Sequence, residues 1–88
     1  MTGKERAELR KIANGLEAIY QVGKDGISPT LINGIDEALT KREILKVSVL
    51  ETCSLTAKEA ANELAAATGA DVIQCIGRKF TLYRQNEE

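Results

Sequence analysis

The sequence predicts an α/β two-layer sandwich with the element order α-β-α-β-α-β-β and a four-stranded mixed sheet. Apolar residues recur at helical spacing in three segments, while the segments between them alternate or are rich in β-branched residues. The last two strand segments are separated only by Gly77-Arg78, a tight hairpin signal. Helical crossovers favour parallel neighbours and a hairpin is antiparallel, so the sheet should be mixed.

The first helix is expected over residues 4–14, where Leu9, Ile12 and Ala13 fall near one side and Gly15 follows to end it. Residues 18–22 (AIYQV) then have the β-branched and aromatic composition of a short strand.

The second helix has the clearest start signal in the chain. Ser28 can cap it and Pro29 suits its first position, because proline lacks the amide hydrogen that this position cannot use. Gly34 inside this helix costs about 1 kcal/mol relative to alanine and marks a close contact. Residues 44–50 follow as a strand, with apolar and polar residues alternating.

The third helix opens with Thr56 and Glu59 in capping-box spacing and ends at Thr68-Gly69. Residues 72–76 and 80–83 form the final hairpin. We expect all three helices to pack against one side of the sheet. The residues expected to be buried between the layers are Leu31, Ile35, Leu39, Val47, Val49 and Leu64.

Length and composition predict one globular domain, residues 1–85, with 86–88 as a frayed polar tail. The chain has 88 residues, of which 43% are apolar and 28% charged. Its two cysteines, Cys53 and Cys75, have no metal-binding spacing, and histidine is absent, so no metal or other cofactor is expected. Reduced thiols and the lack of a long apolar run favour the cytoplasm and disfavour secretion or membrane insertion.

The residue types present in the sequence also argue against an enzyme. No nucleophile–base arrangement is recognisable, and without histidine the commonest general base is missing. Asp36 and Glu37 diverge on adjacent helical positions and are expected to be solvated rather than to act as an acid–base pair.

Charge is unevenly distributed, although the net charge is only −1 and the pI about 5.5. Residues 74–84 contain Arg78, Lys79 and Arg84 and no acid, whereas residues 51–71 are predominantly acidic. A basic surface can therefore exist on a nearly neutral chain.

The segment Gly23-Lys24-Asp25-Gly26 joins the first strand to the second helix. Its glycines allow the backbone to turn sharply and to approach a ligand closely, and the following helix start offers unpaired amides. A phosphate fits this geometry, and a GxxG loop is how KH-type domains clamp single-stranded nucleic acid. An ordinary glycine-rich turn is the other interpretation of the spacing.

Several segments beyond the loop resemble one family when taken together. They are Leu9-Arg10-Lys11, Val22 to Ile27, Glu43-Ile44-Leu45-Lys46-Val47, Thr68-Gly69-Ala70 and Ile76 to Arg84. From about Arg6 to Arg84 the chain resembles a CRM domain (chloroplast RNA splicing and ribosome maturation) of the bacterial stand-alone, YhbY-like type. The resemblance implies a fold similar to the C-terminal domain of translation initiation factor three. It also implies binding of structured RNA, with rRNA in large-subunit precursors as partner, and it places the family's GxxG on Gly23 to Gly26 with Lys24 as its basic residue. Asp25 and the low pI depart from the basic character of such a protein.

The expected function is therefore RNA binding, as an assembly factor of the large ribosomal subunit. The residues predicted to bind RNA are Gly23, Lys24, Asp25, Gly26, Ser28, Arg10, Lys11, Arg78 and Lys79. The alternative interpretation of the basic residues is that they are solvated and do not contact RNA. Tyr20 and Tyr83 could stack on bases, and the alternative for these two residues is burial in the core. A competing function is a protein-interaction module that docks through the acidic third helix or a sheet edge.

Overall fold

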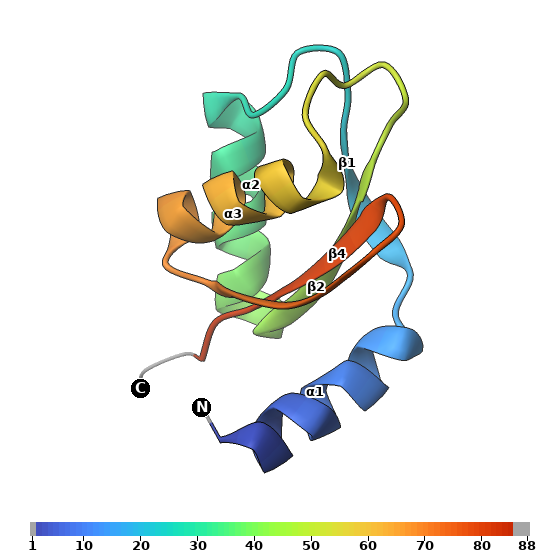
Figure 1. Ribbon diagram of the computed structural model, residues 1–88. Coiled ribbons are helices and arrows are strands. Elements are labelled where there is room, and N and C mark those ends of the chain that lie inside the picture. The colour runs from blue at the N-terminus through green and yellow to red at the C-terminus, as the bar shows by residue number, and fades with distance from the viewer. Residues whose placement is uncertain (1, 86–88) are drawn as a thin grey trace.

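A computed structural model describes residues 2–85 of the chain, so the predicted tail at 86–88 lies outside the described residues. The predicted order α-β-α-β-α-β-β and the mixed four-stranded sheet are confirmed (Figure 1). The elements are α1 (Gly3–Asn14), β1 (Ala18–Val22), α2 (Pro29–Arg42), β2 (Ile44–Val49), α3 (Ala57–Thr68), β3 (Asp71–Ile76) and β4 (Lys79–Tyr83).

The predicted helix boundaries are set by the expected side chains. The Ser28 hydroxyl accepts a hydrogen bond from the amide of Leu31 at the start of α2. At the start of α3, Thr56 and Glu59 form the reciprocal capping box, with both hydrogen bonds at 3.1 Å. Gly69 ends α3 in the left-handed conformation, at φ +71°.

The sheet has the strand order β1-β2-β4-β3. β1 and β2 are parallel, whereas β4 is antiparallel to both of its neighbours, β2 and β3. β1 and β2 run in the same direction, and β4 runs in the opposite direction. The C-terminal ends of β1 and β2 therefore lie at the same end of the sheet as the Gly77-Arg78 turn. This topology places three connections together, which matters for the candidate site.

One face of the sheet is covered by α2 and α3 and forms the main core (Figure 1). Five of the six residues expected in this core are buried, namely Ile35, Leu39, Val47, Val49 and Leu64. Phe80 and Leu82 of β4 complete the cluster. Leu31 is only partly buried and packs against its margin, so the prediction of full burial was wrong for this residue.

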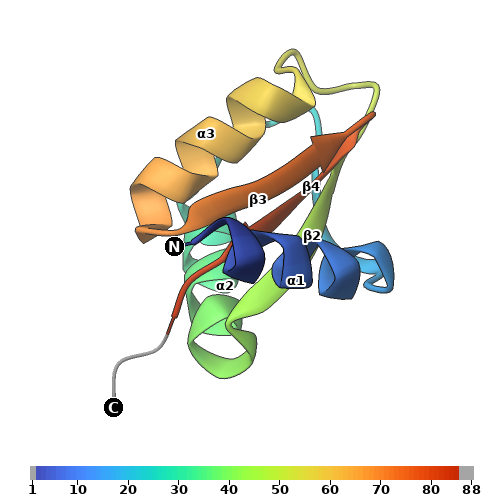
Figure 2. The same cartoon turned by 60° about the horizontal axis from the view of Figure 1, so that its bottom comes forward.

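The prediction that all three helices pack on one side of the sheet is wrong for α1, which lies across the opposite face (Figure 2). Ala13 of α1 and Ile73 of β3 are buried outside the main cluster. The Arg6 guanidinium donates to the carbonyl of Val72, which holds the start of the helix to β3. The apolar stripe of a helix shows which side of the helix is buried, but it does not show which face of the sheet covers it.

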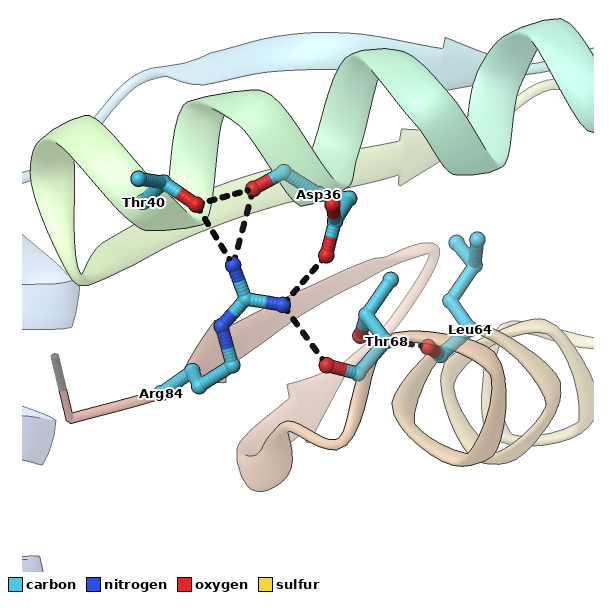
Figure 3. Close-up of polar contacts among 5 residues, drawn as sticks. All are labelled: Asp36, Thr40, Leu64, Thr68 and Arg84. Atoms are coloured by element: carbon cyan, nitrogen blue, oxygen red, sulfur yellow. Dashed lines mark hydrogen bonds and ion pairs between the residues drawn. The ribbon is translucent and has the colours of Figure 1, made fainter. Parts of the chain in front are cut away.

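Arg84 joins the end of β4 to both helices of the main core (Figure 3). Its guanidinium donates to the carbonyl of Thr68 at 2.7 Å, to the hydroxyl of Thr40 and the carbonyl of Asp36 at 2.9 Å each, and pairs with the Asp36 carboxylate. Asp36 is therefore a structural partner of Arg84, not the merely solvated residue that its sequence position predicts.

Candidate nucleic-acid interface

Three connections meet at one end of the sheet, which we call the loop end: residues 23–28, residues 50–56 and the turn at 77–78. The amide of Leu50 donates to the carbonyl of Val22 at 2.8 Å, and the amide of Val49 donates to the carbonyl of Arg78 at 2.7 Å. These backbone bonds hold the predicted GxxG loop and the predicted basic hairpin on either side of the connection that follows β2.

The GxxG loop is a tight turn that leads directly into α2. The amide of Gly26 donates to the carbonyl of Gly23 at 3.0 Å, and Gly26 has φ +66°, a conformation that favours glycine. Gly23 has no such constraint; a Cβ at this position would lie 3.4 Å from the Leu50 side chain, an ordinary contact. The backbone conformation of the loop requires glycine only at position 26. The glycine at position 23 can therefore allow a ligand to approach the backbone closely.

The start of α2 offers fewer donors than a helix start in general. Pro29 has no amide hydrogen and the Leu31 amide is bonded to Ser28, which leaves the amides of Ser28 and Thr30 without a partner among the described residues. Lys24 and Asp25 are exposed at the tip of the loop beside this helix start. The arrangement can present two amides and one ammonium group to an anion.

The predicted hairpin residues lie at the loop end but on different faces. Arg78 lines a cleft of about 370 Å³ together with Glu51 and Cys53. Lys79 pairs with Ser48 of β2 and Ile76 of β3 and points to the face that α1 covers. One strand, β2, separates the GxxG loop from the hairpin, a lateral distance of about 10 Å at the usual strand spacing.

Arg10 and Lys11 are not brought to the loop end by the structure. Both are exposed on α1, which runs across the sheet between its contacts at Val72 and Gln74. At about 100° per residue, Lys11 points away from the side of α1 that buries Ala13. RNA contact by these two residues stays a prediction that concerns a different surface from Lys24.

Tyr20 and Tyr83 are both partly buried, which agrees with the interpretation that they pack against the core. The Tyr20 hydroxyl donates to the carbonyl of Gly34 at 3.1 Å, and the ring packs against the main core. Gly34 thus has the close contact that its position inside a helix indicates.

A basic residue that the sequence prediction left out, Lys46, lines a groove beside α1 together with Lys79 and Thr81. The alternation of apolar and polar residues in β2 could have identified Lys46, because its side chain must point to the face opposite the buried Leu45 and Val47. The groove itself depends on strand pairing, which the sequence does not show.

Neither a metal centre nor a membrane span is found in residues 2–85. No group of three or more potential metal-ligating side chains gathers there. None of the described helices is long and apolar enough to cross a bilayer.

The chain is similar to known proteins both in sequence and in fold. The chain is 39% identical over 88 residues to the "Probable RNA-binding protein YqeI" of Bacillus subtilis, covering 100% of this chain and 92% of the relative. It is 37% identical to the "Probable RNA-binding protein MJ0652" of Methanocaldococcus jannaschii, of which it spans 66%. The solution structure of the hypothetical protein SAV1595 from Staphylococcus aureus matches with a TM-score of 0.82 and 39% identity, over 100% of this chain and 92% of that one.

Residues 1–84 match the family model of the CRS1 / YhbY (CRM) domain, which confirms the resemblance found in the sequence motifs. The match extends over nearly the whole chain, and the relatives just described cover the chain from end to end. This chain therefore belongs to the CRS1 / YhbY (CRM) domain family.

Proposed function

We propose that this protein binds RNA without catalysing a reaction, and that it grips the phosphate backbone with the GxxG loop and the start of α2. The observation that carries the proposal is the turn closed by Gly26 at φ +66°, which joins the exposed Lys24 to a helix start where the amides of Ser28 and Thr30 have no partner among the described residues. Relatives named as RNA-binding proteins over the whole length of the chain support it.

The RNA that we propose is rRNA in precursors of the large ribosomal subunit, which gives the protein an assembly role in the cytoplasm. The support is the family membership together with the similarity to the "Probable RNA-binding protein YqeI", of which this chain covers 92%. Arg78 and Lys79 at the same end of the sheet extend the proposed contact beyond the loop. Phosphate contacts of this kind fix an RNA in place without reading its sequence.

The competing proposal, a docking surface for a protein on the acidic third helix, has less support. The Glu59 carboxylate already accepts the amide hydrogen of Thr56 in the capping box. This bond occupies one of the two exposed acids of α3, Glu59 and Glu63, whereas the loop end has amide donors without a partner among the described residues.

Replacing Lys24 with alanine should weaken RNA binding modestly and leave folding intact, because the side chain is exposed and forms no ion pair among residues 2–85. The slope of log Kd against log salt should fall by about 0.7, the value of one phosphate contact on a single strand. Affinity for a short RNA across a salt series, with thermal melts of both proteins, measures this. Lys58→Ala on the acidic helix is the matched control. An unchanged slope for Lys24→Ala would show that the loop is not the phosphate clamp.

The two glycines of the loop separate a backbone requirement from a ligand requirement. Gly26→Val should lower stability by roughly 1–2 kcal/mol, because a side chain strains the φ of +66°. Gly23→Ala should leave the melting temperature nearly unchanged, since its Cβ meets only an ordinary contact, yet should weaken RNA binding by hindering close approach. If Gly23→Ala binds RNA as tightly as the wild type, the backbone of this loop does not approach the RNA closely.

The assembly role has its own test in cells. Crosslinking followed by sequencing of the bound RNA should recover large-subunit rRNA, and sedimentation should find the protein with subunit precursors. Recovery of other RNA alone would contradict the ribosomal role while leaving RNA binding in place.

A further inference from the structure

Two rows of side chains lie next to each other on the face of the sheet that α1 crosses. Strand pairing aligns Lys46, Thr81 and Gln74 across β2, β4 and β3, and two residues further along the strands it aligns Ser48, Lys79 and Ile76. Side chains two residues apart share a face, at roughly 7 Å spacing, so the two rows form one continuous surface. The second row is the one nearer to the loop end.

These rows enclose a groove at the side of α1. It has a volume of about 150 Å³ and is lined by Asn14, Lys46, Gln74, Ile76, Lys79 and Thr81. The Gln74 side-chain amide donates to the Asn14 carbonyl oxygen at 3.2 Å, which ties α1 to one wall. The bond leaves the carbonyl of Gln74 and the amide hydrogens of Asn14 available to a ligand.

Thr81 is the feature of this groove that needs an explanation. Its side chain is completely buried in the middle strand of the first row, and its Oγ1 has no hydrogen-bond partner among the described residues. Buried hydroxyl groups are normally bonded, because an unpaired one has lost its hydration without compensation. A ligand in the groove would supply the missing partner once the side chains that cover Oγ1 move aside, since this oxygen is not accessible as the groove stands.

The size and lining of the groove favour a flat ring over a phosphate. A cavity of about 150 Å³ accommodates one six-membered ring. Ile76 is 65% exposed beside it, and together with the aliphatic parts of the two lysines it offers apolar contact to ring faces. A phosphate has no apolar surface to match these groups, whereas an unstacked nucleobase has both apolar faces and a polar edge.

The polar groups specify the kind of base. Lys46 and Lys79 only donate hydrogen bonds, and neither forms an ion pair within residues 2–85. Two donors require two acceptors on the ring edge, either carbonyl oxygens or unprotonated ring nitrogens, while the hydroxyl of Thr81 and the carbonyl of Gln74 can accept from a ring N–H between those acceptors. A pyrimidine with two carbonyls flanking an N–H has this edge, whereas the amino group of cytosine would face a lysine that cannot accept.

We propose that this groove is a base-binding site that holds one unpaired uracil of the bound RNA. The inference rests on the proposed RNA binding and deepens it, because it adds recognition of a base to a backbone grip that is indifferent to sequence. The row that contains Lys79 lies at the loop end, so a strand held at the GxxG loop can continue onto this face of the sheet.

The experiment compares a ten-nucleotide oligouridine with an oligocytidine of the same length, at fixed salt, with wild-type protein. Oligouridine should bind about fivefold more tightly or better, the discrimination that one well-formed set of base contacts provides. The side-chain amide NMR signals of Asn14 and Gln74 should shift with oligouridine and not with oligocytidine. Equal affinities would overturn the base site alone, whereas failure to bind either oligonucleotide would overturn RNA binding itself and this site with it.

Two variants test the assignment of the groove. Thr81→Val keeps the shape and removes the hydroxyl, and it should bring the ratio of the two affinities close to one while leaving oligocytidine affinity and the melting temperature unchanged or higher. Lys46→Met should also reduce the ratio, with Lys58→Met as the matched control. If Lys46→Met weakens both oligonucleotides equally and lowers the salt slope, the lysine contacts phosphate and the base site is refuted. A ratio unaltered by Thr81→Val refutes it as well.

Discussion

At the scale of single residues, Gly34 shows how close packing decides the identity of a helical residue. A Cβ at Gly34 would lie 3.1 Å from the Tyr20 hydroxyl and 3.2 Å from its ring, tighter than side chains usually pack. The same tyrosine donates its hydroxyl hydrogen to the Gly34 carbonyl, so moving the ring away would break this bond. The helix therefore keeps a glycine although alanine would favour helix formation by about 1 kcal/mol.

Gly34→Ala should lower the free energy of unfolding by about 1–2 kcal/mol, because overpacking and the loss of the tyrosine bond outweigh the gain in helix propensity. Gly3→Ala is the matched control: Gly3 is exposed in α1 with nothing within 4 Å of a Cβ, so alanine there should stabilise or change nothing. Urea unfolding measures both. Equal stabilisation by the two substitutions would mean that the tyrosine ring moves at no cost.

At the scale of elements, α1 differs from the other helices in how it is held. It packs on the face away from the main core through Ala13, the Arg6 bond to Val72 and the Asn14 bond to Gln74. Two of these three contacts are polar and lie near the surface, while α2 and α3 share one apolar cluster. Elements with few buried apolar contacts open at lower free energy than the core does.

Ala13→Leu should therefore detach α1 selectively, because the added methyl groups have no space where alanine is completely buried. Amide hydrogen exchange should become faster in residues 3–14, by a factor equivalent to about 1–3 kcal/mol, with little change in α3. Ala7→Leu, on an exposed position of the same helix, should leave exchange unaltered. Equally faster exchange in α3 would show instead that all three helices unfold as one unit.

At the scale of the whole molecule, Arg84 closes the fold at the end opposite to the proposed RNA contact. It lies one residue beyond β4 and bonds to groups in both α2 and α3, so one side chain fixes the sheet to the helical layer (Figure 3). The Arg84 side chain is 22% exposed, whereas that of Asp36 is 53% exposed, so solvent partly screens the ion pair between them.

Arg84→Lys should lower the free energy of unfolding by about 1.5–3 kcal/mol, since a single ammonium group cannot reach the partners that the planar guanidinium reaches together. Arg42→Lys, on an exposed position at the end of α2, is the control and should change stability by less than about 0.5 kcal/mol. Denaturant unfolding of the two variants measures the difference. RNA affinity should remain at the wild-type value for Arg84→Lys at temperatures where the protein is folded, because the residue lies away from the loop end.

What the sequence determined by itself is local. The helix starts at Ser28 and Thr56, the turn at Gly77 and the GxxG loop each depend on residues within a few positions of one another, and all are found where the patterns predict them. Family membership could likewise be inferred from the sequence, because the motifs keep their order and spacing along the chain.

What only the tertiary structure decided depends on pairing between distant segments. The face that α1 covers, the alignment of Lys46 with Thr81 and Gln74, and the partners of Arg84 all join residues that lie far apart in the chain. The register irregularity between Val72 and Gln74 changes which face of the sheet the following side chains of β3 point to, and simple alternation cannot show this change. Periodicity identifies the buried side of each element, but the free energy of packing the elements together selects the neighbour, and that choice positions the proposed base site.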